Sequence, residues 1–348
     1  MPKNTALWLR SPGGRFQVGN APYTGPEAGE VVVRTRAVAM NVIDIMPGVA
    51  RRLLLPWLRY PAVVGTDVAG EVVEVGAGVT RLKAGDRVVG HAMGIAKDRS
   101  GAPEGAFQHY VVLLEYMTAN IPEDVSFERG AVLPLAVSTA STGLFQQDHL
   151  GLALPELGAA SRQETVLIWG GSTSVGANAI QLAHNAGYRV VTTASRRNFG
   201  YVTSLGASAA VDYHDRDAVE QIIVAIGDSP LAGVLAIGTG ALKPALEIAQ
   251  RLPGAKRVAA AQPGLIVGLQ QRNARRKGLQ LSAIWAGSLK NNAVGPGVYV
   301  DFLPAALAAR TYVVAPEPII AGTGLEQIPA GMKRLKEGVS AKKVVVAI

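Results

Sequence analysis

The sequence predicts an α/β protein in which a β-rich domain is followed by a doubly wound parallel sheet. Strand patterns fill residues 30–122, whereas strands and amphipathic helices alternate from Thr165 onward. The second pattern is typical of a parallel sheet with crossover helices. At 348 residues, of which 49% are apolar, the chain is long enough for two domains with separate cores.

The first domain is expected at residues 1–130 and the second at residues 131–317. The C-terminal VVVAI has the pattern of a strand that no helix follows, so residues 318–348 are assigned back to the first domain. Four runs rich in β-branched residues and bounded by Gly, Pro or Asp predict the strands of that domain: VVVRTRAVAMN (31–41), AVVGTDVAGEVVEVG (62–76), DRVVGH (86–91) and FQHYVVL (107–113).

The second domain contains up to six strands, enough for one doubly wound sheet. The predicted strands are 165–169, 189–195, 209–213, 233–237, 257–261 and 279–284, and the predicted helices are 175–186, 199–205, 218–226 and 242–252. Gly187 and Gly206 stand just past the first two helices, where glycine commonly ends a helix.

Composition limits the partners and the chemistry. The chain has no cysteine, which excludes disulfides, thiolate zinc sites and a cysteine nucleophile. The first residues lack the apolar core of a signal peptide, and we expect a cytoplasmic protein without membrane partners. The net charge is +8, and the basic residues are scattered except in RNARRK (272–277). This cluster is either a solvated face or a docking patch. Few aromatic residues interleave with these cations, so nucleic acid is not an expected partner.

A glycine-rich turn joins the strand TVLIW to the next helix. Such a turn directs unpaired N–H groups and the positive end of the helix dipole at one point, which suits a pyrophosphate. Compared with the pattern G-x-G-x-x-G, the first and third glycines are present and the middle one is Thr173. The hydroxyls here either donate to phosphate or cap the helix. The candidate cofactor-binding residues are Gly171, Ser172, Thr173, Ser174, Val175 and Gly176.

The second strand ends without the acidic residue that NAD sites usually place there. It ends in Ser195, Arg196, Arg197 and Asn198, whose cations and hydroxyl suit the 2′-phosphate of NADPH. The alternative is a basic loop before a helix. Tyr213, at the end of the third strand, either joins this group or is ordinary packing. Ile237, at the end of the fourth strand, is a further expected contact with NADPH.

With these residues in place, the whole chain resembles the medium-chain dehydrogenase/reductase superfamily. The segments that carry the resemblance are PAVVGTDVAGEVVEVGAGVTRLKAGDRVVG (61–90), VSTASTGLF (137–145) and GGSTSVGANAIQLA (170–183). The resemblance implies a GroES-like β domain, completed by the C-terminal tail, and a Rossmann domain that binds the cofactor, with the active site in a cleft between them.

Zinc alcohol dehydrogenases of this superfamily carry a Cys ligand and a Gly-His-Glu segment. This chain has Gly65-Thr66-Asp67 and no cysteine, so the resemblance points to the zinc-independent branch of quinone oxidoreductases and trans-acting enoyl reductases. Such enzymes reduce an alkene conjugated to a carbonyl, which is expected here to be a small-molecule or carrier-bound acyl substrate.

The predicted catalytic residues are Asn41 and Thr139. Quinone reductases have a segment similar to Asn-x-x-Asp-x-Tyr, and here Asn41 and Asp44 match while Met46 occupies the tyrosine position. Asn41 is expected to contact the substrate carbonyl or the cofactor ribose, or else to be a turn residue. Asp44, also a candidate cofactor-binding residue, is expected to order the local loop rather than to act as a base. The resemblance places Thr139 at the nicotinamide amide, and the alternative is a buried helix hydroxyl. Without the tyrosine, either water supplies the proton, or cofactor hydroxyls and backbone groups hold the carbonyl.

Further candidates are weaker. Leu53, Leu54, Leu55, Trp57 and Leu58 either line an acyl pocket or pack a helix on the β domain, and His91 either faces substrate or packs inside. The segment LQLSAIWAG (279–287) can extend the sheet across a homodimer, and a monomer is the alternative. The leading hypothesis is an NADPH-dependent reductase, and the competing one is a catalytically silent NADPH-binding sensor of the same fold.

Overall fold

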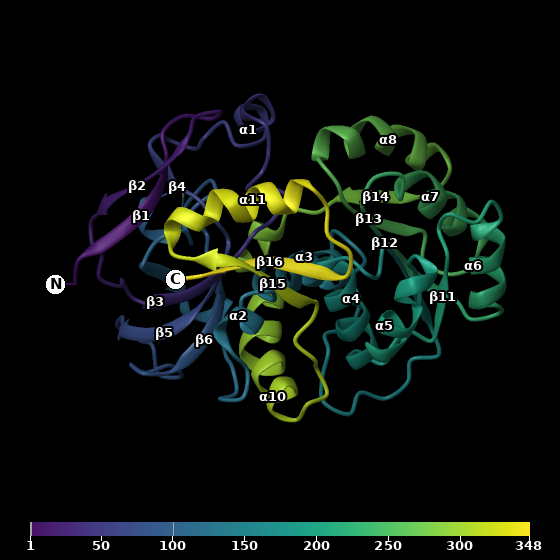
Figure 1. Cartoon of the computed structure of the whole chain (residues 1–348). Helices are drawn as coiled ribbons and strands as arrows, with labels where there is room; N and C mark the ends of the chain where they lie inside the picture. Colours follow the sequence, from purple (N-terminus) through teal and green to yellow (C-terminus); the bar gives the residue numbers. More distant parts are fainter. Residues whose placement is uncertain (1, 100) are drawn as a thin grey trace. The chain divides into compact units, whose positions relative to one another are not determined.

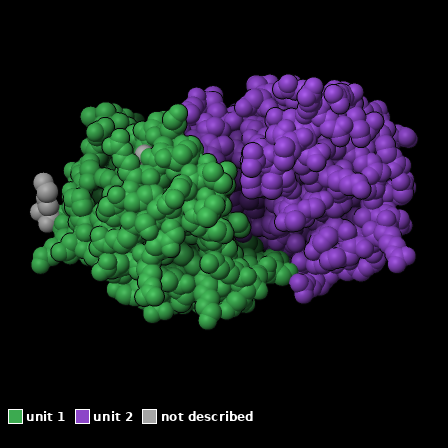
Figure 2. Space-filling view, turned by 90° about the horizontal axis from the view of Figure 1, so that it is seen from above, with its two compact units in different colours: residues 1–135, 314–348 green, residues 136–313 purple. Residues whose placement is uncertain are grey.

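The computed structural model describes residues 2–99 and 101–348, and it divides into two compact units. Unit 1 contains residues 1–135 and 314–348, and unit 2 contains residues 136–313 (Figure 2). The boundaries lie within a few residues of those expected from the sequence. Each unit is described by itself below.

Unit 1 is β-rich because its runs of β-branched residues form strands, and most residues of its longer strands are buried. Its strands are β1 (Asn4–Leu9), β2 (Phe16–Ala21), β3 (Glu30–Ala39), β4 (Ala62–Val63), β5 (Asp67–Val75), β6 (Arg87–His91), β7 (Tyr110–Leu114), β8 (Thr118–Asn120), β15 (Glu317–Thr323) and β16 (Lys342–Ala347). Its helices are α1 (Gly48–Leu54), α2 (Phe127–Gly130) and α11 (Ile328–Lys336), with short 3₁₀ turns at Ala102–Glu104, Glu115–Met117 and Leu325–Gln327.

The C-terminal strand β16 lies inside the main sheet of unit 1. It pairs antiparallel with β3 and parallel with β15, in the order β15-β16-β3-β5-β6-β8, while β7 also pairs with β3. A smaller sheet has the order β2-β1-β4. Strand β16 and the rest of residues 314–348 are therefore part of the β-rich unit.

Unit 2 contains the predicted six-stranded parallel sheet. Its strands β9 (Thr165–Trp169), β10 (Arg189–Thr193), β11 (Ala209–Val211), β12 (Leu231–Ile237), β13 (Arg257–Ala261) and β14 (Gln280–Ala283) have the order β11-β10-β9-β12-β13-β14. All neighbouring pairs are parallel, so the carboxyl ends of the strands share one edge. This is the doubly wound topology, and β9 lies at its centre.

Helices cover this sheet. They are α4 (Ser174–Asn185), α5 (Phe199–Ser204), α6 (Ala218–Ile226), α7 (Leu242–Arg251) and α8 (Gly264–Arg276), and the unit also contains most of α3 (Pro134–Phe145), α9 (Val294–Pro296) and α10 (Leu303–Ala308). Irregular turns span Arg196–Asn198, Ala286–Asn291 and Gly297–Phe302. The strand β14 is at the edge of the sheet, and its pairing with a second copy of the chain stays a prediction.

The helix α8 was not predicted from the sequence. It lies beside β14, next to α7 and β13 (Figure 1). Only Val267 and Ala274 of this helix are buried, and the remainder contains two glycines and a polar run. Because so few apolar residues face the core, the helical periodicity is weak in the sequence.

Candidate active site

The turn between β9 and α4 has the backbone that the glycine pattern predicts. A Cβ at Gly176 would lie only 2.7 Å from the Cα of Gly171 and would overlap the carbonyl oxygen of Gly170, and one at Gly171 would overlap the hydroxyl of Thr192. Both glycines are therefore required for the close approach of the helix to the strands.

Thr173 caps the helix. Its hydroxyl oxygen accepts the N–H of Gly176 at 3.0 Å and donates to the carbonyl oxygen of Gly170 at 2.8 Å. The hydroxyl is thus committed to the backbone, which is the capping role left open by the sequence. Contact between Thr173 and a phosphate through its side chain would require these bonds to break.

The other polar groups of the turn are uncommitted. Among the described residues, no acceptor takes the N–H groups of Ser172, Ser174 or Val175, and no partner binds the hydroxyls of the two serines. These donors stand at the positive end of a twelve-residue helix, α4. The donor set fits a pyrophosphate.

The two arginines after β10 have different partners. Arg196 makes a forked ion pair with Asp215, with Nη2 at 2.9 and 2.7 Å from the two carboxylate oxygens, and its Nε lies 3.6 Å from Asp212. In contrast, no carboxylate within residues 2–99 and 101–348 pairs with the exposed Arg197. Of this arginine pair, Arg197 is the cation available to an incoming phosphate.

Asp212 is an acidic residue at this edge of the sheet that sequence reasoning missed. It follows β11, and it accepts the N–H and the Nδ1 of His214 and the N–H of Arg196. These bonds, led by the backbone N–H of His214, hold the pKa of Asp212 below its usual value. The carboxylate is therefore occupied by protein donors. The signal was present as Asp212 in the strand-end segment VDYHD, but its pairing depends on the fold.

The remaining predicted cofactor residues lie at strand ends or in the following turn. Tyr213 is 44% exposed, and its ring stacks at 4.0 Å on that of His214. Ile237 is buried at the end of β12, and Asn198 bonds through Nδ2 to the hydroxyl of Ser195. All these residues stand near the carboxyl edge of the sheet of unit 2, as the fold requires for a dinucleotide site.

The hydroxyls of helix α3 divide into paired and unpaired groups. Ser138 bonds to Tyr299 at 2.9 Å, and Thr139 is half-buried with a polar contact of its own. The buried hydroxyls of Ser141 and Thr142 have no hydrogen-bond partner among the described residues. An unpaired buried hydroxyl is costly, and one explanation is a ligand that supplies the partner.

In unit 1, a buried carboxylate organises the other predicted site residues. Asp67 Oδ2 accepts Lys343 Nζ at 2.5 Å and Asn41 Nδ2 at 2.7 Å, and Oδ1 accepts the N–H of Leu135 at 2.5 Å. Asp67 is fully buried and Lys343 nearly so. The sequence did not identify Lys343, because it is 276 residues from Asp67 along the chain.

The same hydrogen bonds fix the orientation of the side-chain amide of Asn41. Its Nδ2 also donates to the hydroxyl of Thr66 at 3.1 Å, so both amide hydrogens are used. The oxygen Oδ1 is the group left over, and it is an acceptor. Asn41 in this arrangement is left with Oδ1 as a hydrogen-bond acceptor, because Asp67 and Thr66 occupy its Nδ2.

Asp44 orders the loop that follows β3. Its Oδ2 accepts the N–H of Asn41 at 2.8 Å, and its carbonyl oxygen accepts Nη2 of the buried Arg51 at 2.9 Å. Burial, the largest cause, raises the pKa of Asp44 to about 7. These contacts tie Asp44 to the loop that follows β3, and its role in cofactor binding stays a prediction.

His91 is buried, and it pairs in register with Asp67 across β5 and β6. Burial lowers the pKa of His91 to about 4, so its ring is neutral at pH 7. No group of three His, Cys, Asp or Glu residues that could hold a metal occurs in the described part of the chain.

The apolar segment 45–61 is mostly core. Leu55 and Leu58 are buried, and Trp57 packs against the same cluster and donates Nε1 to the carbonyl oxygen of Ile95. Leu53 is 72% exposed. The packing alternative therefore describes most of this segment, and a role in lining an acyl pocket stays a prediction for Leu53 and Leu54.

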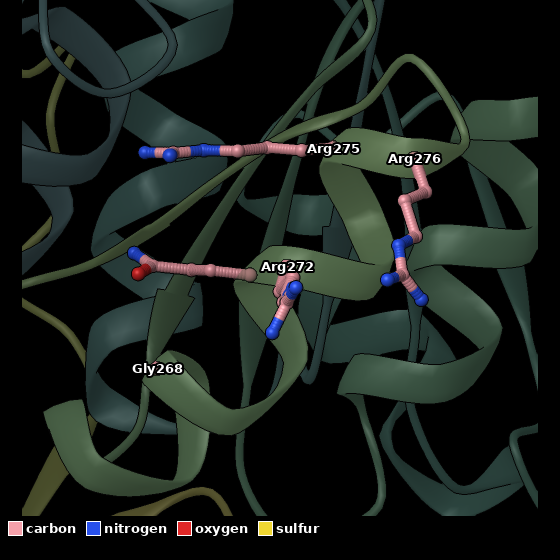
Figure 3. Close-up of a pocket in the computed structure, with 5 residues that line it drawn as sticks. Gly268, Arg272, Arg275 and Arg276 are labelled. Atoms are coloured by element: carbon pink, nitrogen blue, oxygen red, sulfur yellow. The ribbon is translucent and has the colours of Figure 1, made fainter.

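A shallow basic hollow lies on α8 in unit 2, apart in sequence from the glycine turn. Gly268, Gln271 and three arginines line it, and the labelled arginine side chains extend around it (Figure 3). None of the predicted site residues lines it. Among the described residues, no helix is long and apolar enough to cross a membrane.

The glycine turn in a parallel sheet, together with a β-rich unit, is the architecture expected of a dehydrogenase. Residues 27–123 match the alcohol dehydrogenase GroES-like domain family. The chain is 44% identical to the dehydrogenase pigH of Monascus ruber, over 100% of both proteins, and 35% identical to the trans-enoyl reductase himH of Aspergillus japonicus, over 99% and 97%. The structure of the quinone oxidoreductase from Coxiella burnetii matches 100% of both chains with a TM-score of 0.70 and 22% identity, which shows the fold.

The chain belongs to the medium-chain dehydrogenase/reductase superfamily. The fold class and family expected from the sequence are thus confirmed.

Replacing Lys343 with Met should destabilise unit 1, because it leaves the buried Asp67 carboxylate without its cation. We expect a loss of about 3–5 kcal/mol in the free energy of unfolding, measured in urea, and a smaller loss in the double variant Asp67→Asn/Lys343→Met. Lys342→Met, on the exposed face of the same strand, is the control. A loss below about 1 kcal/mol would show that the pair is not needed.

Replacing Asp44 with Asn should change how stability depends on pH. With a pKa of about 7 when folded and about 3.9 when unfolded, the folded state alone holds the proton between these values. Raising the pH from 4 to 7 therefore destabilises the wild type through this group. Relative to Asp44→Asn, wild-type stability should fall by up to about 4 kcal/mol over that range. Urea unfolding across the pH range measures it, with the exposed Asp228→Asn as control, and parallel curves would contradict the assignment.

Proposed function

We propose that the protein is an NADPH-dependent reductase of the activated double bond of an α,β-unsaturated carbonyl, such as an enoyl thioester, an enone or a quinone, and that it works without a metal. The observation that carries this proposal is that both parts of a dinucleotide site are available among the described residues. The glycine turn has N–H groups without an acceptor, and Arg197, after the next strand, has no carboxylate partner. The relatives named as a trans-enoyl reductase and a quinone oxidoreductase support the same reaction class.

The residues divide the binding task. The N–H groups of Ser172, Ser174 and Val175 hold the pyrophosphate, and Arg197 holds the 2′-phosphate as a charge-assisted donor. Arg196, already paired with Asp215, shapes this loop. The Oδ1 of Asn41 accepts a ribose hydroxyl, since its amide hydrogens are used by Asp67 and Thr66.

When bound, the reduced nicotinamide supplies the hydride that the reaction needs. Reduction of the double bond gathers negative charge on the carbonyl oxygen and requires a proton at the α carbon. Asn41 does not donate to that oxygen, and Met46 offers no proton. Water is the proposed source of the proton, Asn41 would hold a ribose hydroxyl of the cofactor through Oδ1, and positioning would supply most of the acceleration.

The direct test mixes the protein with NADPH and a panel of enones, quinones and enoyl thioesters, and follows the absorbance of the reduced nicotinamide. Calorimetry measures NADPH binding separately. Turnover of one class of acceptor is the expected result. Binding without turnover of any acceptor would favour the silent sensor instead, and absence of binding would remove both hypotheses.

Arg197→Glu should separate the two cofactors. It should weaken NADPH binding roughly 10–100-fold, as expected for loss of a charge-assisted bond, and change NADH binding less than about twofold. Fluorescence titration of both cofactors measures this. Lys333→Glu, on the exposed side of α11, is the control for the change in net charge. Equal losses for NADPH and NADH would contradict the 2′-phosphate assignment.

A further inference from the structure

The helix α8 presents a face of exposed apolar and basic residues. Leu265 and Leu269 are 74% and 77% exposed, and Ile266 is also exposed. Residues 265, 269, 272 and 276 follow one another at helical spacings of four, three and four, so two leucines and two arginines form a single stripe. The stripe is opposite the buried Val267 and Ala274. Exposed leucines in such an arrangement indicate a contact surface.

The cations at the C-terminal end of α8 are exposed. Within residues 2–99 and 101–348, no carboxylate pairs with Arg272, Arg275, Arg276 or Lys277, and positions 264–277 contain no Asp or Glu. Arg251 on the neighbouring α7, by contrast, pairs with Glu220 and Glu247. Figure 3 shows the arginine side chains of α8 directed away from the helix around the hollow. The helix dipole favours cations in the last turn, but it does not account for the exposed leucines at the other end.

The leucine end of the stripe lies at the edge of the sheet that holds the cofactor turn. The strand β13 ends at Ala261 and α8 begins at Gly264, whereas β9 ends at Trp169 just before the glycine turn. Because these strands run parallel in one sheet, both carboxyl ends face the same edge. A molecule bound on α8 is therefore placed at the edge where a dinucleotide and its substrate bind.

We propose that the exposed stripe of α8 docks an acidic carrier protein, which delivers the unsaturated acyl group to this enzyme as a thioester. This inference rests on the proposed reductase function and names the form in which its substrate arrives. Carboxylates of the carrier pair with Arg272 and Arg276, and apolar residues of the carrier cover Leu265 and Leu269. The same stripe of a second copy would bring no carboxylate to Arg272 and Arg276, because positions 264–277 contain no Asp or Glu. A small anion would leave the leucines exposed.

The basic balance of the chain supports the same occupant. The net charge of +8 attracts an acidic protein over a distance, and the stripe of α8 adds the local contacts that orient it. Docking of this kind weakens with rising salt, because exposed charges are screened. Salt dependence is therefore part of the expected behaviour.

The test compares one enoyl group on two carriers: a purified acidic acyl-carrier domain and N-acetylcysteamine. The variants are Arg272→Glu/Arg276→Glu and, with charge unchanged, Leu265→Ser/Leu269→Ser. Each should raise the KM for the carrier-bound substrate about tenfold and leave the KM and kcat for the N-acetylcysteamine thioester unchanged. The control is Lys333→Glu/Lys336→Glu, which reverses two exposed charges on α11.

Binding is measured apart from turnover, by the fluorescence anisotropy of the labelled carrier domain without substrate. The wild type should bind at low salt and lose affinity at high salt, and both α8 variants should bind about tenfold more weakly. Equal affinity of wild type and variants, or equal losses with both thioesters, would overturn the docking site. A wild-type dimer that the leucine variant dissociates, with no carrier binding, would overturn it in favour of a second copy.

The experiments distinguish an error in the α8 docking site from an error in the proposed reductase function. If the small thioester is reduced but the α8 variants bind the carrier normally, the docking site is wrong and the reductase stands. If the carrier binds through α8 but no acceptor is reduced, the docking site stands and the reductase is wrong. Binding of α8 to phosphatidylserine vesicles, together with no carrier binding, would also overturn the carrier as the occupant.

Discussion

The carboxylate of Asp67 is the constraint on which unit 1 and its candidate site depend. A buried charge is tolerated only when donors surround it, and this one has three: Lys343, Asn41 and the N–H of Leu135. These donors come from the C-terminal strand, the loop after β3 and the start of α3. One carboxylate thus joins three separate parts of the chain. Displacing any of them would remove a donor from a buried charge, which costs free energy of folding.

The same constraint determines what Asn41 does. An amide side chain can donate or accept, but a carboxylate accepts only, so Asp67 turns the NH₂ group of Asn41 toward itself. The oxygen of Asn41 is left as an acceptor, which fits the proposed contact with a ribose hydroxyl better than one with a substrate carbonyl. The sequence left these roles open because the choice depends on Asp67 and Thr66, which are 26 and 25 residues away.

Prediction from the sequence was reliable where the pattern is local. The six strands of unit 2, the helix after the glycine turn and the C-terminal strand all follow from the period of apolar residues. Contacts between distant residues were not visible: the partner of Asp67 and the ion pair that occupies Arg196 were both found only in the structure. The helix α8 was missed because most of its apolar residues are exposed. Its apolar residues therefore do not recur with the period of a helix that buries one face.

The cluster RNARRK shows how a fold changes the meaning of a sequence pattern. From the sequence alone, a solvated face explains this cluster of positive charge as well as a docking patch does. Once the segment is a helix, Leu265 and Leu269 fall on the same stripe as Arg272 and Arg276, although they precede the cluster. Solvation explains exposed arginines but not exposed leucines aligned with them. The two kinds of residue together are what a protein partner requires, because charge attracts and orients it while apolar contact holds it.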